Sequence, residues 1–470
     1  MSSIPPSSDP LTEAEIPTEL LARYDRPGPR YTSYPTAPHM DPSYGDSRWK
    51  ADLDTACEEH PDSPTSIYVH IPFCESLCYF CGCHTIISTR RERATPYLDR
   101  IEKELRILRP WLDRRGPVIQ VHLGGGTPSY LNRDEIERLS QVLSTLNISP
   151  EAECSVEIDP RDLDTERLQA FAQGGFRRIS MGVQDLDATV QKTVNRIQPE
   201  IMTRDTIQSA RELGFRSVNL DLIYGLPHQT PESFAKTLQT ILDLAPDRIA
   251  LFNYAHVPWL KKHQKLLDPA QMPSASDKLS IFLQSIQTLG RSGYQYIGMD
   301  HFARSDDELA KAQREGRLWR NFQGYTICKT DLYGLGTSSI SMLDGSYCQN
   351  AKSLTEYYDS IDRGSLPIVR GIKLNQDDRI RRHCIMSLMC NFRLDQKDLE
   401  KHFPEQNTSR LFESAHQSLQ EMSQDGLVLL QPQSIEVLPV GRLLIRNICM
   451  AFDAYLSGDE TENPRYSRTV

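Results

Sequence analysis

The chain lacks the features that would place it in a membrane, export it or bind it to nucleic acid. No apolar run approaches the ~20 residues that a helix needs to cross a bilayer. The N-terminal stretch MSSIPPSSDPLTEAEIP has neither the basic start nor the apolar core of a secretory signal. No block of Lys and Arg of binding length occurs, and the net charge is −10. We therefore expect a cytoplasmic protein with no membrane partner and no nucleic-acid partner.

The cysteine content and the length indicate the redox state of the thiols and the number of domains. Eleven cysteines, an odd number, in a long chain without an export signal indicate reduced thiols. The composition, 39% hydrophobic and 25% charged, is that of a globular protein. A chain of 470 residues suits one large domain and a smaller one.

Four cysteines lie close together in the stretch SIYVHIPFCESLCYFCGCHT: Cys74, Cys78, Cys81 and Cys83. The first three have the spacing C-x3-C-x2-C, and the apolar, β-branched run 67–73 before them predicts a buried strand that ends in a loop. Three thiolates on one short loop can bind three corners of a 4Fe–4S cube. The fourth iron is then left for a ligand that is not a protein thiolate.

Three other interpretations of these cysteines are open. A structural zinc site prefers two separated pairs of ligands, and no second C-x2-C or H-x3-H half is obvious. Ordinary buried thiols are common in protein cores, although this clustering is unusually dense. A ferredoxin-like electron carrier would use Cys83 as a fourth ligand. The C-x-C spacing leaves little room for its two thiolates to bind two corners of one cube. We therefore favour three thiolate ligands and a fourth iron that no protein thiolate binds.

From Ser66 onward, strand-like and helix-like stretches alternate, which predicts parallel βαβ units and an α/β fold. Pro231–Leu244 has Thr230 as its expected N-cap and Pro231 at the first helical position. Six strands with helices outside them suggest an open (β/α)6 barrel. The predicted strands are Ile67–Pro72, Val118–Leu123, Glu153–Ile158, Arg178–Val183, Ser217–Ile223 and Arg248–Asn253, and the predicted helices are Thr95–Leu112, Arg133–Leu146, Pro231–Leu244 and 274–295.

The sequence pattern of the last hundred or so residues differs from the alternation of strands and helices before them. We expect helices at Asp377–Phe392 and Arg410–Met422, a hairpin in DGLVLLQPQSIEVLP, and a final amphipathic helix at Gly441–Tyr455. Helices followed by a short hairpin are typical of a winged-helix-like domain. DNA binding is not expected, because the apolar side chains of the last helix make it a packing surface.

Polar residues gather where the predicted strands end. Gly124–Thr127 follows the second strand, and glycine amides can bind a carboxylate at close range. Glu157 and Asp159 share one face of the third strand. Because a buried carboxylate must be compensated, we expect them to face a water-filled barrel interior or to pair with an arginine such as Arg161. Asp221 lies in an apolar strand, with Arg196 as a candidate partner. Further polar strand ends are Met181–Asp185, Asn219–Pro227 and Phe252–His256, whereas His70, His122 and His256 are expected to be structural.

The chain resembles a known family. C-x3-C-x2-C after a strand is similar to the signature of radical S-adenosylmethionine enzymes, in which S-adenosylmethionine chelates the open iron. The strings IYVHIPFC and LCYFCGC, with PRYTSYPTA, CNFRLD and GRLLIRNICM, resemble the oxygen-independent coproporphyrinogen III oxidase family from about Arg23 to the C-terminus. The resemblance implies a partial (β/α)6 TIM-like barrel with an N-terminal arm and a smaller, mostly helical, winged-helix-like C-terminal domain.

The resemblance also implies the site residues. Cys74, Cys78 and Cys81 would hold the 4Fe–4S cluster. Residues implied for the cluster-bound S-adenosylmethionine are Tyr68, Gly125, Gly126, Thr127, Glu157 and Ile340, and those implied for a second S-adenosylmethionine are Phe80, Gln184, Arg196, Asp221 and Ala255. No residue is assigned a catalytic role. A family loop is slightly longer than Tyr325–Thr330 here, which affects local substrate contacts but not the cluster.

The implied activity is the oxygen-independent oxidative decarboxylation of two propionates of coproporphyrinogen III to vinyl groups, which gives protoporphyrinogen IX. The implied partners are this substrate, a reduced electron donor and an electron acceptor, and we expect a monomer. Two alternatives are a haem chaperone of the same superfamily, which typically lacks the C-x-C ending at Cys83, and a non-enzymatic iron–sulfur carrier. Arginines that could face the propionates are Arg23, Arg26, Arg30 and Arg161.

We expect five segments along the chain. These are a mobile N-terminal extension at 1–22, an N-terminal arm at 23–60, the radical S-adenosylmethionine barrel at 61–300, a connecting region that completes the active site at 301–365, and the C-terminal domain at 366–470.

Overall fold

A computed structural model describes residues 11, 17–456 and 469 of the chain. The chain forms two compact units, each built from separate segments. The barrel unit comprises Met40–Ile281 and Thr330–Lys373, and the terminal unit comprises Met1–His39, Phe282–Lys329 and Leu374–Val470. Among the described residues, no helix has the length and apolar character needed to cross a membrane.

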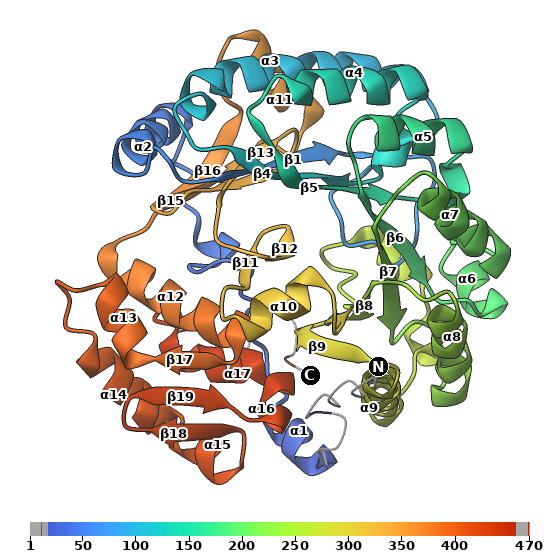
Figure 1. Cartoon of the computed structure of the whole chain (residues 1–470). Coiled ribbons are helices and arrows are strands. Elements are labelled where there is room, and N and C mark those ends of the chain that lie inside the picture. The colour runs from blue at the N-terminus through green and yellow to red at the C-terminus, as the bar shows by residue number, and fades with distance from the viewer. Residues whose placement is uncertain (1–10, 12–16, 457–468, 470) are drawn as a thin grey trace, which may run out of the picture. The chain divides into compact units, whose positions relative to one another are not determined.

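Six parallel strands form the centre of the barrel unit and lie side by side in chain order (Figure 1). Their apolar side chains are almost fully buried, as in Ile67, Val69 and Ile71 of β1. The prediction of parallel βαβ units is therefore confirmed, because strands covered on both faces need such apolar runs. The strands are β1 Thr65–Ile71, β4 Val118–Gly125, β5 Ile148–Ile158, β6 Arg178–Gln184, β7 Ser217–Tyr224 and β8 Arg248–Asn253.

Helices connect these strands and lie on the outer side of the sheet (Figure 1). The start of α8 is fixed as its sequence predicts: Thr230 accepts a hydrogen bond from the Ser233 amide, and Pro231 takes the first position. Asn132 and Glu135 form the equivalent capping box of α4. The helices are α3 Ala94–Leu112, α4 Arg133–Ser144, α5 Thr165–Gln173, α6 Ala188–Thr193, α7 Glu200–Glu212 and α8 Pro231–Asp243, with α9 Ala275–Arg291 after β8.

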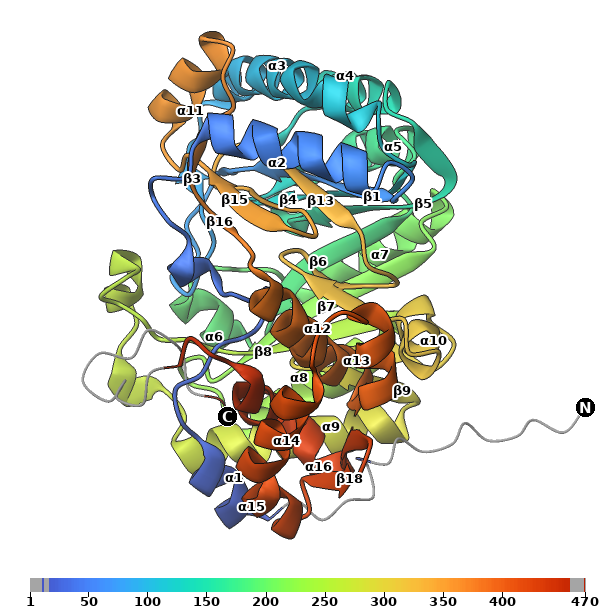
Figure 2. The same ribbon diagram turned by 90° about the vertical axis from the view of Figure 1, so that its left-hand side faces the viewer.

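The sheet of the barrel unit extends beyond β1 through strands that the sequence patterns did not predict. β13 pairs with β1 in parallel, and β14, β15 and β16 follow in antiparallel order. In Figure 2, α2 and α11 lie on the same side of this unit as α3 and α4. The bounds are α2 Asp46–Glu59, β13 Asp331–Leu335, β14 Ile340–Met342, β15 Ser346–Asn350, α11 Leu354–Asp362 and β16 Ile368–Lys373, with the short pair β2 Phe73–Cys74 and β3 Ile86–Ile87.

Fully buried Glu104 of α3 ties this extension to the outer helices. Its carboxylate accepts hydrogen bonds from the Gly336 amide at 2.8 Å, from Asn350 Nδ2 at 2.6 Å and from the Tyr357 hydroxyl at 2.6 Å. Burial raises the pKa of Glu104 to about 7 despite these three donors. One side chain thus fixes the loop after β13, the end of β15 and helix α11 together.

The terminal unit contains the small three-stranded antiparallel sheet β17-β19-β18 and several helices. Helices followed by the β18–β19 hairpin form the winged-helix-like arrangement that the sequence predicts. The bounds are α1 Thr18–Tyr24, β9 Tyr294–Gly298, β10 His301–Arg304, α10 Glu308–Arg314, β11 Trp319–Asn321, β12 Gly324–Thr326, α12 Gln376–Asn391, β17 Arg393–Asp395, α13 Gln396–His402, α14 Ser409–Ser418, α15 Gln420–Gln424, β18 Val428–Gln431, β19 Ser434–Val437, α16 Pro439–Leu443 and α17 Ile445–Cys449.

Two helix predictions in this unit were too long. The expected final helix 441–455 is broken into α16, α17 and a short 3-10 turn, Met450–Phe452, with Leu444 in a non-helical conformation between the first two. The expected helix 410–422 is likewise split at Leu419 into α14 and α15. In both places the interrupting leucine is fully buried, so tertiary packing overrides its helical propensity.

The five expected segments stay a prediction. Each of the two compact units combines segments that are far apart in the sequence. Most of the expected mobile extension, residues 1–22, lies outside the described residues, whereas Thr18–Tyr24 forms α1.

Candidate functional site

The cysteine loop begins where β1 ends. Phe73 is fully buried against Tyr97 and Tyr130, with ring centroids 5.4 and 5.2 Å away, and this packing fixes the chain just before Cys74. All four cysteines of the loop line one open cavity, which has about 750 Å³ of empty space. No disulfide involves them. The clustering of the thiols that the sequence predicts is therefore present in the structure.

A hydrogen bond and nearby cations favour the thiolate form of one of these cysteines, Cys81. A hydrogen bond from Cys83 lowers the pKa of Cys81 to about 6, and Lys261 and His263 act in the same direction against the effect of burial. The same contact with Cys81, together with burial, raises the pKa of Cys83. Cys78 Sγ lies 3.4 Å from Arg161 Nη2 and 3.7 Å from Arg196 Nη1. Burial raises the pKa of Cys74, so the binding of iron would have to displace the proton of that thiol.

The glycine-rich turn after β4 forms a second wall of the cavity. The Gly126 amide donates to the Ile71 carbonyl at 2.8 Å, and the Thr127 amide donates to Phe73 at 2.9 Å. Gly125 has φ +120°, and a Cβ there would come within 2.7 Å of the His70 ring. Only glycine fits this backbone, which brings the turn directly against the start of the cysteine loop.

Glu157 of β5 lies beside this turn. Its Oε2 accepts the Gly125 amide at 3.0 Å, and its Oε1 lies 3.2 Å from Nε2 of His122. Desolvation would raise its pKa, but the contact with His122 and the Gly125 amide together hold the pKa of Glu157 below its usual value. The carboxylate is thus kept charged at the cavity wall, where it can accept hydrogen bonds from a ligand.

Asp159 is held by the two arginines that also approach Cys78. Its Oδ2 lies 2.7 Å from Arg161 Nη2 and 3.0 Å from Arg196 Nη1. Although burial opposes it, the positive charge of Arg196, together with Arg161, lowers the pKa of Asp159 to about 2. The prediction that Asp159 pairs with an arginine such as Arg161 is confirmed.

The expectation that Arg196 pairs with Asp221 was wrong. Arg196 instead donates to Asp159 and, at 2.6 Å, to the Gly182 carbonyl. Asp221 accepts from Asn219 Nδ2 at 2.7 Å and from Ser180 Oγ at 3.4 Å, and burial together with the charge of Glu157 raises its pKa to about 7. Arg196 is therefore paired with Asp159, and the hydrogen bonds that Asp221 accepts within the described part of the chain come from neutral donors.

Gln184 sits in a strained conformation at the end of β6. Its φ is +70°, and a register shift in the β6–β7 ladder lies between Gly182 and Gln184. Its Oε1 is buried and has no hydrogen-bond partner among the described residues, as is also true of Arg196 Nε. Buried polar atoms are rarely left unpaired, so this side of the cavity is prepared for a polar ligand.

Most of the residues that the family resemblance implies lie around this one cavity. Three do not line it. Tyr68 in β1 bonds His70 Nδ1 at 3.0 Å and stacks on His122, the Ala255 carbonyl accepts from Gln264 at 3.3 Å, and Ile340 opens β14. Those that line it are Cys74, Cys78, Phe80, Cys81, Gly125, Gly126, Thr127, Glu157, Gln184, Arg196 and Asp221.

The sequence analysis did not single out several other lining residues. Ser180 lines the cavity together with Gly182 and Gln184 of the predicted strand end Met181–Asp185, and the period of two along β6 could have found Ser180 once Gln184 was placed. Ser76, Leu77, Thr85 and Ile87 also line it and come from the cysteine loop and β3. Nothing in their residue types signals a ligand.

The four proposed propionate arginines are placed differently from one another. Arg23 and Arg30 form ion pairs with Asp425 and Asp300 in the terminal unit. The Arg26 amide donates to Thr469 Oγ1 at 3.2 Å. Only Arg161 lines the cavity, and Asp159 already engages it.

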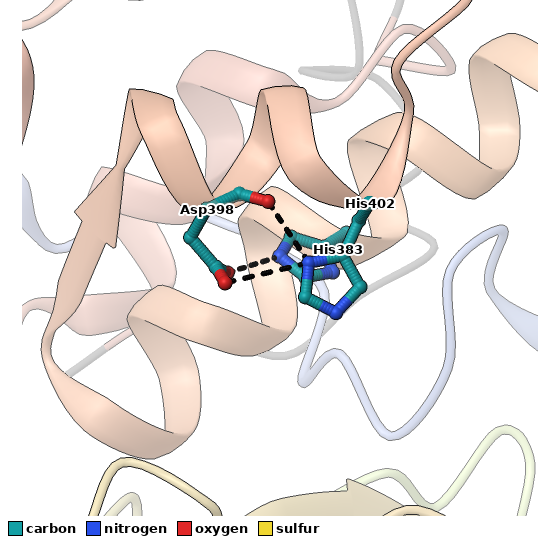
Figure 3. Close-up of side chains that lie close together, drawn as sticks. All are labelled: His383, Asp398 and His402. Atoms are coloured by element: carbon teal, nitrogen blue, oxygen red, sulfur yellow. Dashed lines mark hydrogen bonds and ion pairs between the residues drawn. The ribbon is translucent and has the colours of Figure 1, made fainter.

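The terminal unit holds a separate cluster of His383, Asp398 and His402 (Figure 3). His383 Nε2 lies 3.0 Å from Asp398 Oδ2, and His402 Nδ1 lies 2.9 Å from the Asp398 carbonyl. Burial lowers the pKa of His383, and the neighbouring charges of His402 and Lys329 add to this effect. All three side chains already have hydrogen bonds within the cluster, which links α12 to α13, and the adjacent lysine disfavours a further cation.

Comparison with known proteins agrees with this geometry. The sequence model of the radical SAM superfamily, where SAM is S-adenosylmethionine, matches residues 68–241. This stretch contains the cysteine loop, the glycine turn and five of the six parallel strands in whole or part. The fold and the thiol-lined cavity thus define a radical SAM enzyme.

Relatives that cover nearly the whole chain identify the family. The oxygen-independent coproporphyrinogen III oxidase of Salmonella typhimurium is 47% identical over 98% of this chain and 100% of its own length, and that of Escherichia coli is 47% identical over 96% and 98%. The solved structure of the Escherichia coli coproporphyrinogen III oxidase, described as a radical SAM enzyme, has a TM-score of 0.89 and 46% identity and covers 94% of this chain and 99% of that one. The chain belongs to the oxygen-independent coproporphyrinogen III oxidase family.

Proposed function

We propose that this enzyme converts two propionate side chains of coproporphyrinogen III to vinyl groups without oxygen and so forms protoporphyrinogen IX. The observation that carries this proposal is the cavity in which three suitably spaced cysteines face a glycine-rich turn. The similarity to full-length oxidases supports the choice of substrate. We further infer that the enzyme acts as a cytoplasmic monomer whose segments follow the boundaries expected from the sequence.

The residues around the cavity fit a 4Fe–4S cluster and S-adenosylmethionine. Cys74, Cys78 and Cys81 would hold the cluster, and the amides of the 125–127 turn and the carboxylate of Glu157 would bind the amino acid part of S-adenosylmethionine. Together, these groups would supply a 5′-deoxyadenosyl radical, which removes a hydrogen atom from the β-carbon of a propionate.

We also propose that a second S-adenosylmethionine binds beside Phe80, Gln184, Arg196 and Asp221. The strained backbone of Gln184 and its unpaired Oε1, together with the unpaired Nε of Arg196, support this assignment. Asp221, which accepts hydrogen bonds from neutral donors, can exchange hydrogen bonds with the hydroxyls or ammonium of such a ligand. Arg196 therefore offers a positive charge to the carboxylate of this zwitterionic ligand, and Asp221 offers a carboxyl group that can hydrogen-bond to the ligand.

The overall reaction needs an electron donor and an acceptor. After a hydrogen atom is lost, the propionate releases carbon dioxide and one electron, and the carbon–carbon double bond of the vinyl group remains. The electron must leave to an acceptor, and another must enter from a reduced donor for each turnover. The chain's own task is to hold the reacting carbon close and to keep water away from it.

The test is anaerobic reconstitution with iron, sulfide, a reductant, S-adenosylmethionine and coproporphyrinogen III, followed by product analysis. We expect methionine, 5′-deoxyadenosine, carbon dioxide and protoporphyrinogen IX. Methionine without a vinyl product would contradict the oxidase activity but leave the superfamily intact. Stoichiometric haem binding without turnover would instead favour a haem chaperone.

Replacing Arg161 by glutamine is expected to make the reduction potential of the bound cluster more negative. The guanidinium lies 3.4 Å from Cys78 Sγ, and loss of a nearby positive charge disfavours an added electron. A redox titration followed by electron paramagnetic resonance measures the shift. The control is Arg133→Gln, which removes an exposed arginine of α4 paired with Glu137. An unchanged or more positive potential in Arg161→Gln would contradict the expectation.

A further inference from the structure

The segment between β8 and α9 rests on the backbone of the cysteine loop. Lys261 Nζ donates to the Cys83 carbonyl at 2.8 Å, His263 Nε2 lies 2.8 Å from the Cys81 carbonyl, and Gln264 Nε2 donates to the Phe80 carbonyl at 3.0 Å. His263 and Gln264 lie in the short 3-10 helix Lys262–Leu266, and Lys261 directly precedes it. The segment is therefore in direct contact with the backbone of the loop that carries the expected cluster ligands.

This segment exposes large apolar side chains. Trp259 is 68% exposed, Leu260 is 73% exposed and Leu266 is 62% exposed. Scattered exposed leucines are ordinary, but three large apolar residues so close together, including a tryptophan, are typical of a contact surface for another protein. Tryptophan is also enriched among the residues that contribute most to protein–protein binding.

The same segment carries positive charge on an otherwise acidic protein. The whole chain has a net charge of −10, yet the stretch AHVPWLKKHQKLL, residues 255–267, contains no Asp or Glu. Lys262 and Lys265 are exposed. Such local charge attracts a partner of opposite sign and speeds its encounter with the surface.

We propose that Trp259, Leu260, Lys262, Lys265 and Leu266, here termed the 259–266 surface, dock an acidic one-electron carrier protein that reduces the cluster. This inference rests on the proposed function, because the proposed reaction requires that a cluster held by this loop be reduced by one electron. The carrier is oxidised by one electron and the cluster is reduced by one, with no bond made or broken. Electron-transfer complexes are small and weak, so a surface of this size is sufficient.

The position of the 259–266 surface argues against substrate binding there. None of its five residues lines the cavity, whereas all four cysteines, Glu157 and Asp221 do. A substrate must reach the reacting atoms inside the cavity. An electron carrier needs only to approach the cluster from outside, and the contacts of Lys261, His263 and Gln264 with the loop place this surface there.

The test compares two reductants on cluster-loaded enzyme under anaerobic conditions: a purified acidic flavodoxin reduced to its hydroquinone, and dithionite, which is too small to need docking. Stopped-flow absorbance follows cluster reduction directly, without substrate or product. The variants are Trp259→Ser and Lys262→Glu, and the matched control is Lys236→Glu, an exposed lysine of α8 in the same unit. Iron content and the circular dichroism spectrum check that each variant is folded and loaded.

With flavodoxin, Trp259→Ser is expected to slow cluster reduction by about tenfold or more, as loss of a central tryptophan does. Lys262→Glu should slow it severalfold at low salt and less at high salt, because rim charges act mainly on the association rate. With dithionite all variants should match the parent enzyme, and Lys236→Glu should match it with both reductants.

Three outcomes would overturn the proposal. Equal slowing with both reductants would mean that the variants disturb the cluster site itself. Unchanged rates with flavodoxin would mean that it docks elsewhere. A higher KM for coproporphyrinogen III under dithionite, with normal flavodoxin reduction, would assign the surface to the substrate. Failure of the proposed activity would appear separately, as absence of a vinyl product while the two reductants still differ.

Discussion

Cys81→Ser is expected to lose the iron–sulfur cluster and all activity, whereas Cys83→Ser should keep the cluster. Both thiols line the same cavity, but Cys81 is the one whose pKa is lowered, to about 6, by a hydrogen bond from Cys83 and by Lys261 and His263. The thiolate is the form that ligates iron. Burial and the contact with Cys81 raise the pKa of Cys83, and Cys83 lies outside the C-x3-C-x2-C spacing of the three expected ligands, so we expect it to donate a hydrogen bond to Cys81 rather than to bind iron.

Iron and sulfide analysis and the absorbance near the cluster's visible bands distinguish the two variants after identical anaerobic reconstitution. S-adenosylmethionine binding to Cys83→Ser then shows whether one iron is still open. Loss of the cluster in Cys83→Ser, with its retention in Cys81→Ser, would reverse the roles given to the two thiols. Cys328→Ser is a matched control, because this cysteine lies far along the sequence in the terminal unit and is not among the cavity's lining residues.

The six central parallel strands could be predicted because their sequence signal is local. β8 has the bounds Arg248–Asn253 that its apolar run predicts, and the other five strands differ from their predictions only at the ends. The cysteine spacing likewise required no tertiary information, since one loop carries all three expected ligands. The glycine turn was expected at the end of β4, where parallel sheets commonly bind ligands.

Other features depend on contacts between distant residues and could not be predicted. β14 to β16 are short antiparallel strands; β15 is buried along its whole length and β16 is mostly part-exposed, so neither shows a clear alternation of buried and exposed residues. Asp159 and Asp221 looked equivalent in sequence as acids in apolar strands, and only the path of the chain brings Arg196 to the first. The family resemblance supplied most lining residues, but it could not show that Gln184 has a left-handed backbone or that its amide oxygen is unpaired.

Gly126→Ala is expected to reduce activity by about a hundredfold, because a displacement of about 1 Å in a positioning group can cost that much. A Cβ on Gly126 would lie 2.6 Å from the Pro72 carbonyl oxygen and 2.7 Å from that of Phe73. These atoms belong to backbone, so they cannot swing away as a flexible side chain would. The turn and the start of the cysteine loop must instead separate.

That separation would break two hydrogen bonds that hold the two walls of the cavity together. The amides of Gly126 and Thr127 donate to Ile71 and Phe73, and both bonds run from the turn to the strand that leads into Cys74. The amides that would bind S-adenosylmethionine and the thiols that would hold the cluster are thus positioned relative to each other by this one contact. We therefore expect weakened S-adenosylmethionine binding while most of the iron is retained.

Gly82→Ala is the matched control, because this glycine lies inside the cysteine loop itself, yet a Cβ there meets no atom within 4 Å and its φ is not positive. Equilibrium binding of S-adenosylmethionine, iron content and turnover are measured for both variants and the parent enzyme. If proximity to the cysteines alone determined the effect, Gly82→Ala would be the more harmful change. If close backbone packing determines it, as the geometry requires, Gly82→Ala keeps near-normal binding and Gly126→Ala does not; equal behaviour of the two variants would contradict the role given to the turn.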